Sequence, residues 1–248
     1  MLLSCTLFAC SKDVSEPEPE PEPKFDVSAK MVSLHSGDEY LITTVNGTNV
    51  TFESDNPYIA TVDKISGKVT ARTIGVTMIR VSSNQGNASV RVTVEPVYNT
   101  FKEPFVNFKK TRNQVISACG TPDSETSNGL LYYHSSVGKH VADIYLFEND
   151  FLSSSTALIN QDFASEAMQF LLERYVPIDS EGGMYMFVNG DSIETITMGI
   201  TLFKMSGYKL YCVQYMPYTD DTRSSYDELE VENIINSFDM ERLEHYKE

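Results

Sequence analysis

The stretch SDNPYIATVD at residues 54–63 decides the fold of the first half of the chain. Asn56-Pro57 is a turn signal, and we expect Ile59 and Val62 to face inward after it. Two further apolar runs, GKVTA at 67–71 and GVTMI at 75–79, follow at short spacing. Gly67 permits a positive φ at the turn that opens the first of them. Short apolar runs with turn signals between them predict short strands joined by tight turns.

The same pattern extends over residues 26–96, which are rich in Val, Ile and Thr. Asn46-Gly47, Ser66-Gly67 and Gln85-Gly86-Asn87 are turn signals within it. The expected strands are Tyr40–Val45, Val50–Glu53, Ile59–Val62, Lys68–Ala71, Thr77–Ser82 and Ala88–Val94. Several short strands at regular spacing predict an all-β sandwich for this segment.

Residues 26–96 resemble the bacterial Ig-like domain, group 2. The likeness rests on the three stretches quoted first, on VSLHSGD at 32–38 and on VRVTV at 90–94. Phe52 stands where that family often carries Trp, and it fills a similar core position. The resemblance implies an Ig-like sandwich of the kind found in adhesins, surface enzymes and stalk repeats. A passive spacer is the plainer interpretation of such a module.

The first ten residues end in Leu7-Phe8-Ala9-Cys10, which resembles a bacterial lipobox. The resemblance implies that Cys10 is the lipidated residue, although Phe8 is larger than the residue usual at its position. The apolar run before Cys10 is short for a signal peptide and no basic residue precedes it. We therefore expect the natural start to lie upstream, or the chain to have been trimmed.

Glutamate and proline alternate from Glu16 to Pro23. Such a segment cannot bury apolar surface and favours an extended polyproline form. We interpret residues 1–25 as a lipoprotein signal remnant with an acidic linker. The sequence contains no apolar run long enough for a transmembrane helix. We expect a surface-exposed outer-membrane lipoprotein of the cell envelope, which contacts the membrane through its lipid anchor.

Composition changes in residues 97–248, which we assign to a second domain of unknown function. This part holds 22 of the 27 aromatic residues and has 23 acidic and 11 basic residues. The whole chain has a net charge of -16. Phosphate contacts need basic surface, so this charge argues against nucleic acid as a partner.

The second domain is predicted to follow the order α-βββ-α-βββ-α, an architectural duplication. Thr111 and Gln114 have the spacing of a capping box, and Gly120 should end the first helix. Helices are also expected over Phe163–Tyr175 and Tyr226–Phe238, each with one apolar face. The expected strands are Leu130–His134, His140–Glu148, Phe151–Ile159, Met184–Val188, Ile193–Phe203 and Tyr208–Met216. These elements predict an α+β two-layer domain, an antiparallel sheet with helices on one face. It resembles uncharacterised tail domains of surface lipoproteins, which imply no activity.

Few residues of the second domain suggest catalytic chemistry. His134 and His140 flank a short turn and are candidate cross-strand neighbours, but no third metal ligand is evident. Cys119 and Cys212 are expected as buried free thiols, with a disulfide as the alternative that export would allow. No catalytic motif occurs, and acid pairs such as Asp191 with Glu194 are expected by chance. We therefore expect no catalytic residues, no metal, no cofactor and no enzyme.

Tyrosines on the strands of the second domain are the remaining candidates for a binding surface. On an exposed sheet face they would stack on sugar rings or anchor a protein partner; the alternative is an ordinary core and rim. These tyrosines are Tyr132, Tyr133, Tyr185, Tyr211, Tyr215 and Tyr218. The expected function is non-catalytic binding or adhesion, with an unidentified glycan or protein as partner. The alternatives are a surface enzyme that processes glycans or peptides and a structural subunit of an envelope assembly.

Overall fold

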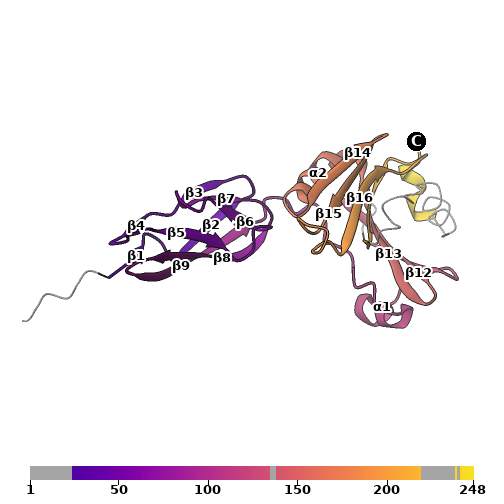
Figure 1. Cartoon of the computed structure of the whole chain (residues 1–248). Coiled ribbons are helices and arrows are strands. Elements are labelled where there is room, and N and C mark those ends of the chain that lie inside the picture. The colour runs from indigo at the N-terminus through magenta and orange to yellow at the C-terminus, as the bar shows by residue number, and fades with distance from the viewer. Residues whose placement is uncertain (1–23, 135–137, 219–237, 239–240) are drawn as a thin grey trace, which may run out of the picture.

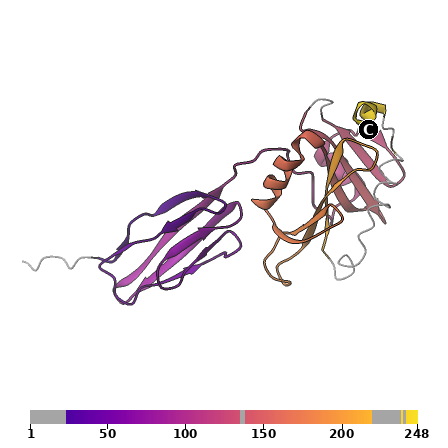
Figure 2. The ribbon, with the colours of Figure 1, turned by 90° about the horizontal axis from the view of Figure 1, so that it is seen from above.

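The computed structural model describes residues 24–134, 138–218, 238 and 241–248. It contains two bodies joined end to end (Figures 1 and 2). The first body holds strands β1–β9, and the second holds β10–β17 with helices α1 and α2. The described chain begins at the end of the first body that lies farthest from the second (Figure 1).

The first body is an all-β sandwich with short strands. A four-stranded sheet has the order β2-β9-β8-β5, and a three-stranded sheet has the order β3-β7-β6; β1 pairs with β4. Only β2 and β9 run parallel, and the other pairs are antiparallel. The strands are β1 (Asp26–Val27), β2 (Met31–His35), β3 (Glu39–Leu41), β4 (Thr44–Val45), β5 (Thr51–Ser54), β6 (Ala60–Val62), β7 (Lys68–Ala71), β8 (Gly75–Ser83) and β9 (Gly86–Glu95).

Turn chemistry and alternation explain why this sequence forms the sandwich. Asn46 and Gly67 both adopt positive φ, at 58° and 74°, in the turns expected for them. Along β8 and β9 buried residues alternate with more exposed ones, so each strand places one face in the core. The aromatic ring of Phe52 lies in that core and is only 5% exposed. The expected sandwich is confirmed, with 40–45 divided between β3 and β4.

The second body is built on one eight-stranded antiparallel sheet. Its order is β10-β11-β12-β13-β17-β16-β15-β14, so two four-stranded halves meet at the β13–β17 pair. The strands are β10 (Ser124–Glu125), β11 (Gly129–Tyr133), β12 (His140–Glu148), β13 (Phe151–Asn160), β14 (Val176–Glu181), β15 (Met184–Val188), β16 (Met198–Lys204) and β17 (Leu210–Pro217). The helices are α1 (Arg112–Cys119), α2 (Ala164–Leu172) and the 3-10 helices η1 (Gln161–Phe163) and η2 (Glu241–Tyr246).

Both faces of this sheet are covered over its central strands. Val115 of α1 packs with Tyr132, and Phe170 of α2 packs with Val213, so the two helices lie on the same face. Leu243 of η2 packs on the opposite face. A sheet buried on both sides has two sets of inward side chains, which is why β12 is almost continuously buried.

The structure corrects several expectations for this domain. The strand expected over Ile193–Phe203 begins only at Met198, because residues before it form a hydrogen-bonded turn in which Thr195 N–H donates to the Ser192 carbonyl. Strand β14 was not expected. The helix expected over Tyr226–Phe238 lies outside the described residues, apart from Phe238. In the described residues strands outweigh the few helices, so the domain is mostly β and the α+β class is not confirmed.

Helix α1 has the start and end that the sequence predicts. The Gln114 side chain accepts a hydrogen bond from the Thr111 N–H at 3.2 Å, as in a capping box. Gly120 follows with φ of 92°. Within the described residues, no helix is both apolar enough and long enough to cross a membrane.

The end of α2 joins the two bodies. The Tyr58 hydroxyl donates to the Arg174 carbonyl at 2.7 Å, and the Ile74 N–H donates to the Glu173 carbonyl at 2.8 Å. The Glu173 carboxylate accepts from the backbone N–H of Val97 at 3.0 Å. The first body is thus held to the second by backbone and side-chain hydrogen bonds as well as by the connecting chain.

Candidate functional site

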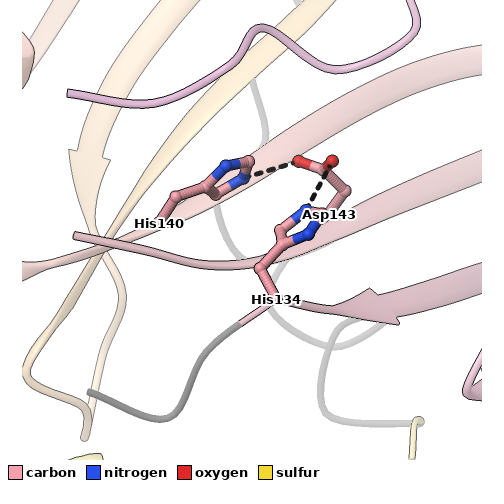
Figure 3. Close-up of side chains that lie close together, drawn as sticks. All are labelled: His134, His140 and Asp143. Carbon is pink, nitrogen blue, oxygen red and sulfur yellow. Dashed lines mark hydrogen bonds and ion pairs between the residues drawn. The ribbon is translucent and has the colours of Figure 1, made fainter. Parts of the chain in front are cut away.

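Two histidines and an aspartate converge on the helix-covered face of the second domain. His134 Nε2 lies 2.9 Å from Asp143 Oδ2, and His140 Nε2 lies 2.8 Å from Asp143 Oδ1 (Figure 3). The two imidazole rings are 4.2 Å apart between centroids. The side chains of His140 and Asp143 are 13% and 10% exposed, whereas that of His134 is 41% exposed. The cluster is therefore buried on one side and open on the other.

A β-bulge brings His140 and Asp143 together. Residues three apart on a regular strand point to opposite faces of the sheet. Between His140 and Ala142 the register with β13 shifts by one residue, so β12 carries an extra residue there. His140 and Asp143 consequently share a face. Tyr132 is the cross-strand partner of Asp143, and His134 lies two residues after Tyr132, so its side chain reaches the same face.

The cluster opens into a cavity of about 390 Å³. One wall is the end of α1 with Cys119, and another is the segment Lys102–Phe105, which leads in from the first body. Tyr145 holds that segment, because its hydroxyl accepts the Phe105 N–H at 3.2 Å. Phe101 packs edge-on against His140, with ring centroids 5.7 Å apart.

Burial and hydrogen bonding shift the pKa values in this cavity. Burial acts to raise the pKa of Asp143, but hydrogen bonds from His134 and His140 outweigh it and hold that pKa below its usual range. The hydrogen bond to Asp143 raises the pKa of His134, against the effect of burial. Burial raises the pKa of the Cys119 thiol, so this thiol is not activated.

The sequence alone did not reveal Asp143 as the third member of the cluster. The spacing His140-x-x-Asp143 suggests opposite faces unless the bulge is known. The available signal was an acid in the apolar middle of a strand, since β12 reads HVADIYLFE. A lone acid in such a strand calls for a partner, because a buried charge without one is costly.

The tyrosines proposed as a common binding surface do not form one. Tyr132 and Tyr215 are 8% and 0% exposed, so they do not lie on an open sheet face; Tyr132 instead lines the cavity beside the histidine cluster. The reason is that elements cover both faces of the sheet. The guanidinium carbon of Arg242 lies over the Tyr133 ring, 5.0 Å from the ring centroid. Tyr211 is half-buried and packs against the core beneath α2.

Two of the proposed tyrosines line hollows near the β14 edge of the sheet. Tyr185, 41% exposed, lines one between α2 and β14. Tyr218 lines the other, of about 310 Å³. These two remain candidates for ligand contact.

The other sequence candidates are placed apart. Cys119 and Cys212 form no disulfide; Cys119 packs against the core on one sheet face and Cys212 lies in the core on the other, so a bridge between them would need rearrangement. Asp191 lies 3.9 Å from Arg72 in the first body, in an ion pair across the junction. Cys10 lies outside the described residues, and its lipidation remains a prediction.

Comparison with known proteins identifies one part of the chain. Residues 43–85 match the family model described as the immunoglobulin-like domain of intimin. No protein with a curated description matched the sequence.

Solved structures of the surface layer protein SbsC align with most of the chain. Its domains 4–9 share 12% identity at a TM-score of 0.28, over 79% of this chain and 27% of that one. Its domains 5–6 share 14% identity at a TM-score of 0.26, over 79% of this chain and 84% of that one. The chain thus spans about a quarter of the longer SbsC structure, and these scores are too low to relate the folds. What the sequence match and the sandwich together establish is that the first body contains an Ig-like domain.

Proposed function

We propose that this protein is a cell-envelope lipoprotein, anchored through Cys10, that acts as a non-catalytic binding or adhesion module at the cell surface. In this arrangement the Ig-like domain is a spacer and the second domain is the recognition head. The single observation that carries the proposal is the end-to-end arrangement of the two bodies, with the described chain starting at the end of the Ig-like domain opposite the head. A tether at that end would present the head outward.

The contacts between the bodies support a head held in a fixed direction. Hydrogen bonds from Tyr58 and Ile74 reach the end of α2, and neither depends on long flexible side chains. A spacer that is docked onto its head limits the directions in which the head can point. This lowers the entropy lost when a surface-bound head meets its ligand.

The candidate contact residues of the head are those lining the hollows beside β14. Exposed Ile178 and Tyr185 lie there, and aromatic side chains at a partly exposed edge suit contact with a sugar ring or a protein side chain. This is a much smaller surface than the sequence predicted.

Localisation and binding are tested separately. Mass spectrometry of the natively produced protein should find acyl chains on Cys10, and protease treatment of intact cells should remove the head. Glycan-array and pull-down screens with the purified chain should give a ligand whose binding weakens in Tyr185→Ala but not in Tyr40→Ala, a variant in the Ig-like domain. An unmodified Cys10 and a purely cytosolic pool would refute the envelope assignment. Turnover of a glycan or peptide library, without stable binding, would refute the non-catalytic assignment.

One observation favours a surface hydrolase as the second candidate. His134, His140 and Asp143 converge beside a cavity, as titratable side chains do in enzyme active sites. If the protein turns over a member of the glycan or peptide library, loss of that turnover in His140→Gln would support this candidate.

A further inference from the structure

We propose that His134, His140 and Asp143 form a binding site for one divalent transition-metal ion, with Zn²⁺ as the ion that the ligands suit best. This inference does not depend on the proposed surface role. It starts from three side chains that the bulge in β12 and the end of β11 place on one face.

The donor atoms lie close enough for one ion to bind all three. They lie within 4.8 Å of one another, and the two nitrogen-to-oxygen distances are 2.9 Å and 2.8 Å. With Zn²⁺ bonds of about 2.1 Å, donors in a tetrahedral site are about 3.4 Å apart. The distances between donor pairs therefore need to change by no more than about 1.5 Å for one ion to bind all three.

The donor types indicate which ion fits. Two imidazole nitrogens and one carboxylate oxygen suit Zn²⁺, whereas Ca²⁺ and Mg²⁺ prefer all-oxygen sites. Both histidines already point Nε2 at the carboxylate (Figure 3). An ion placed between them would replace the two hydrogen bonds with three bonds to the metal.

Surrounding contacts keep the ligands in position. His140 is held by the edge of the Phe101 ring, and the Asp143 backbone is fixed between β11 and β13. His140 and Asp143 lie on β12, and ligands on strands are held more firmly than ligands on loops, so these two lose little conformational entropy on binding. His134, the most exposed of the three, leaves the site reachable from solvent.

Three protein ligands leave the fourth position of a tetrahedral ion open. Here that position would face the cavity lined by Lys102, Cys119 and Tyr145. Structural zinc sites are usually closed by four protein ligands, whereas an open position admits water or an exchangeable ligand. The Cys119 sulfur is not within the mutual donor distance of the other three, so the site is a nitrogen and oxygen site.

The test is metal binding to the tag-free full chain after chelator treatment and dialysis. Calorimetric titration with Zn²⁺ should show one binding site per chain. Bound Co²⁺ should give the visible absorption bands that are typical of a low coordination number. We expect His134→Gln and Asp143→Asn each to weaken binding at least about 10-fold. His35→Gln is the matched control, because His35 lies in the Ig-like domain, and it should bind as the wild type does.

A measurement on the unaltered protein guards against variants that fail to fold. X-ray absorption of the Zn²⁺-loaded wild type should show nitrogen and oxygen neighbours, including imidazole scattering, and no sulfur. Absence of stoichiometric binding would overturn the proposal. So would sulfur in the first coordination shell, or affinity that stays unchanged in both His134→Gln and Asp143→Asn.

Discussion

Replacing Glu173 with Gln should destabilise the second domain far more than a surface ion pair of the same type would suggest. The Glu173 side chain is 5% exposed and pairs with Arg174, which is 10% exposed. It also accepts the backbone N–H groups of Val97 at 3.0 Å and Tyr98 at 3.1 Å. Gln keeps the volume and one acceptor oxygen, but it removes the charge that compensates Arg174.

The size of the effect follows from burial. Breaking a buried pair from one side costs about 3–5 kcal/mol. Arg174 retains the Phe170 carbonyl at 3.0 Å and stacks on the Phe170 ring, so we place Glu173→Gln near the lower end, at about 3 kcal/mol. For a domain of this size that corresponds to a fall in Tm of about 6–12 °C.

Glu166→Gln is the matched control. Glu166 is an acid in α2, the helix that Glu173 follows, and it is also paired, with Lys139, but the side chains of Glu166 and Lys139 are 28% and 41% exposed. Such a pair contributes about 0–1 kcal/mol, so Tm should change little. Differential scanning calorimetry of both variants at equal concentration decides the matter. Equal shifts of Tm in the two variants would refute the reasoning that burial determines how much the Glu173–Arg174 pair contributes to stability.

Three further predictions concern single features of the fold. Gly67→Ala should lower the free energy of unfolding of the Ig-like domain by about 1–3 kcal/mol in urea, because φ is +74° and a Cβ would lie 2.6 Å from the Phe52 ring; wild-type stability would contradict this. Val92→Ala, at a fully buried position, should cost about 2–3 kcal/mol in the same assay, and a cost below about 1 kcal/mol would show that the core relaxes around the cavity. Burial raises the pKa of Tyr58 and Tyr132 to about 12, so the folded state binds these protons more tightly than the unfolded chain, and stability should fall as pH rises above about 10. Ultraviolet titration of phenolate should show that Tyr58 and Tyr132 ionise well above about pH 10. Ionisation of all tyrosines near about pH 10 without unfolding would contradict this prediction.

Turn chemistry made the Ig-like domain readable from sequence. Asn46 and Gly67 mark turns because their backbones must adopt positive φ, and few other residues do so cheaply. In the second domain, the two residues between the expected strands His140–Glu148 and Phe151–Ile159 have the same property, since Asn149 and Asp150 adopt φ of 50° and 70°. Local signals of this kind are independent of the rest of the fold.

Features set by tertiary contacts could not be predicted in the same way. Strand β14 contains Pro177 and is exposed along most of its length, so it lacks the apolar alternation that marks a strand. Ile193 looked like a strand residue but is 69% exposed in a turn. The sequence also does not say that both sheet faces are covered, and for this reason the tyrosines do not share one exposed face.

One segment of chain links the junction between the bodies to the histidine cluster. Glu173 holds the chain at Val97, and a few residues later Phe101 contacts the His140 ring. The same segment then forms the cavity wall at Lys102–Phe105. Glu103 fixes this wall further, because it accepts a hydrogen bond from the buried Tyr215 hydroxyl at 3.3 Å. The direction in which the Ig-like domain points and the shape of the cavity therefore depend on one stretch of backbone, so the two cannot vary independently.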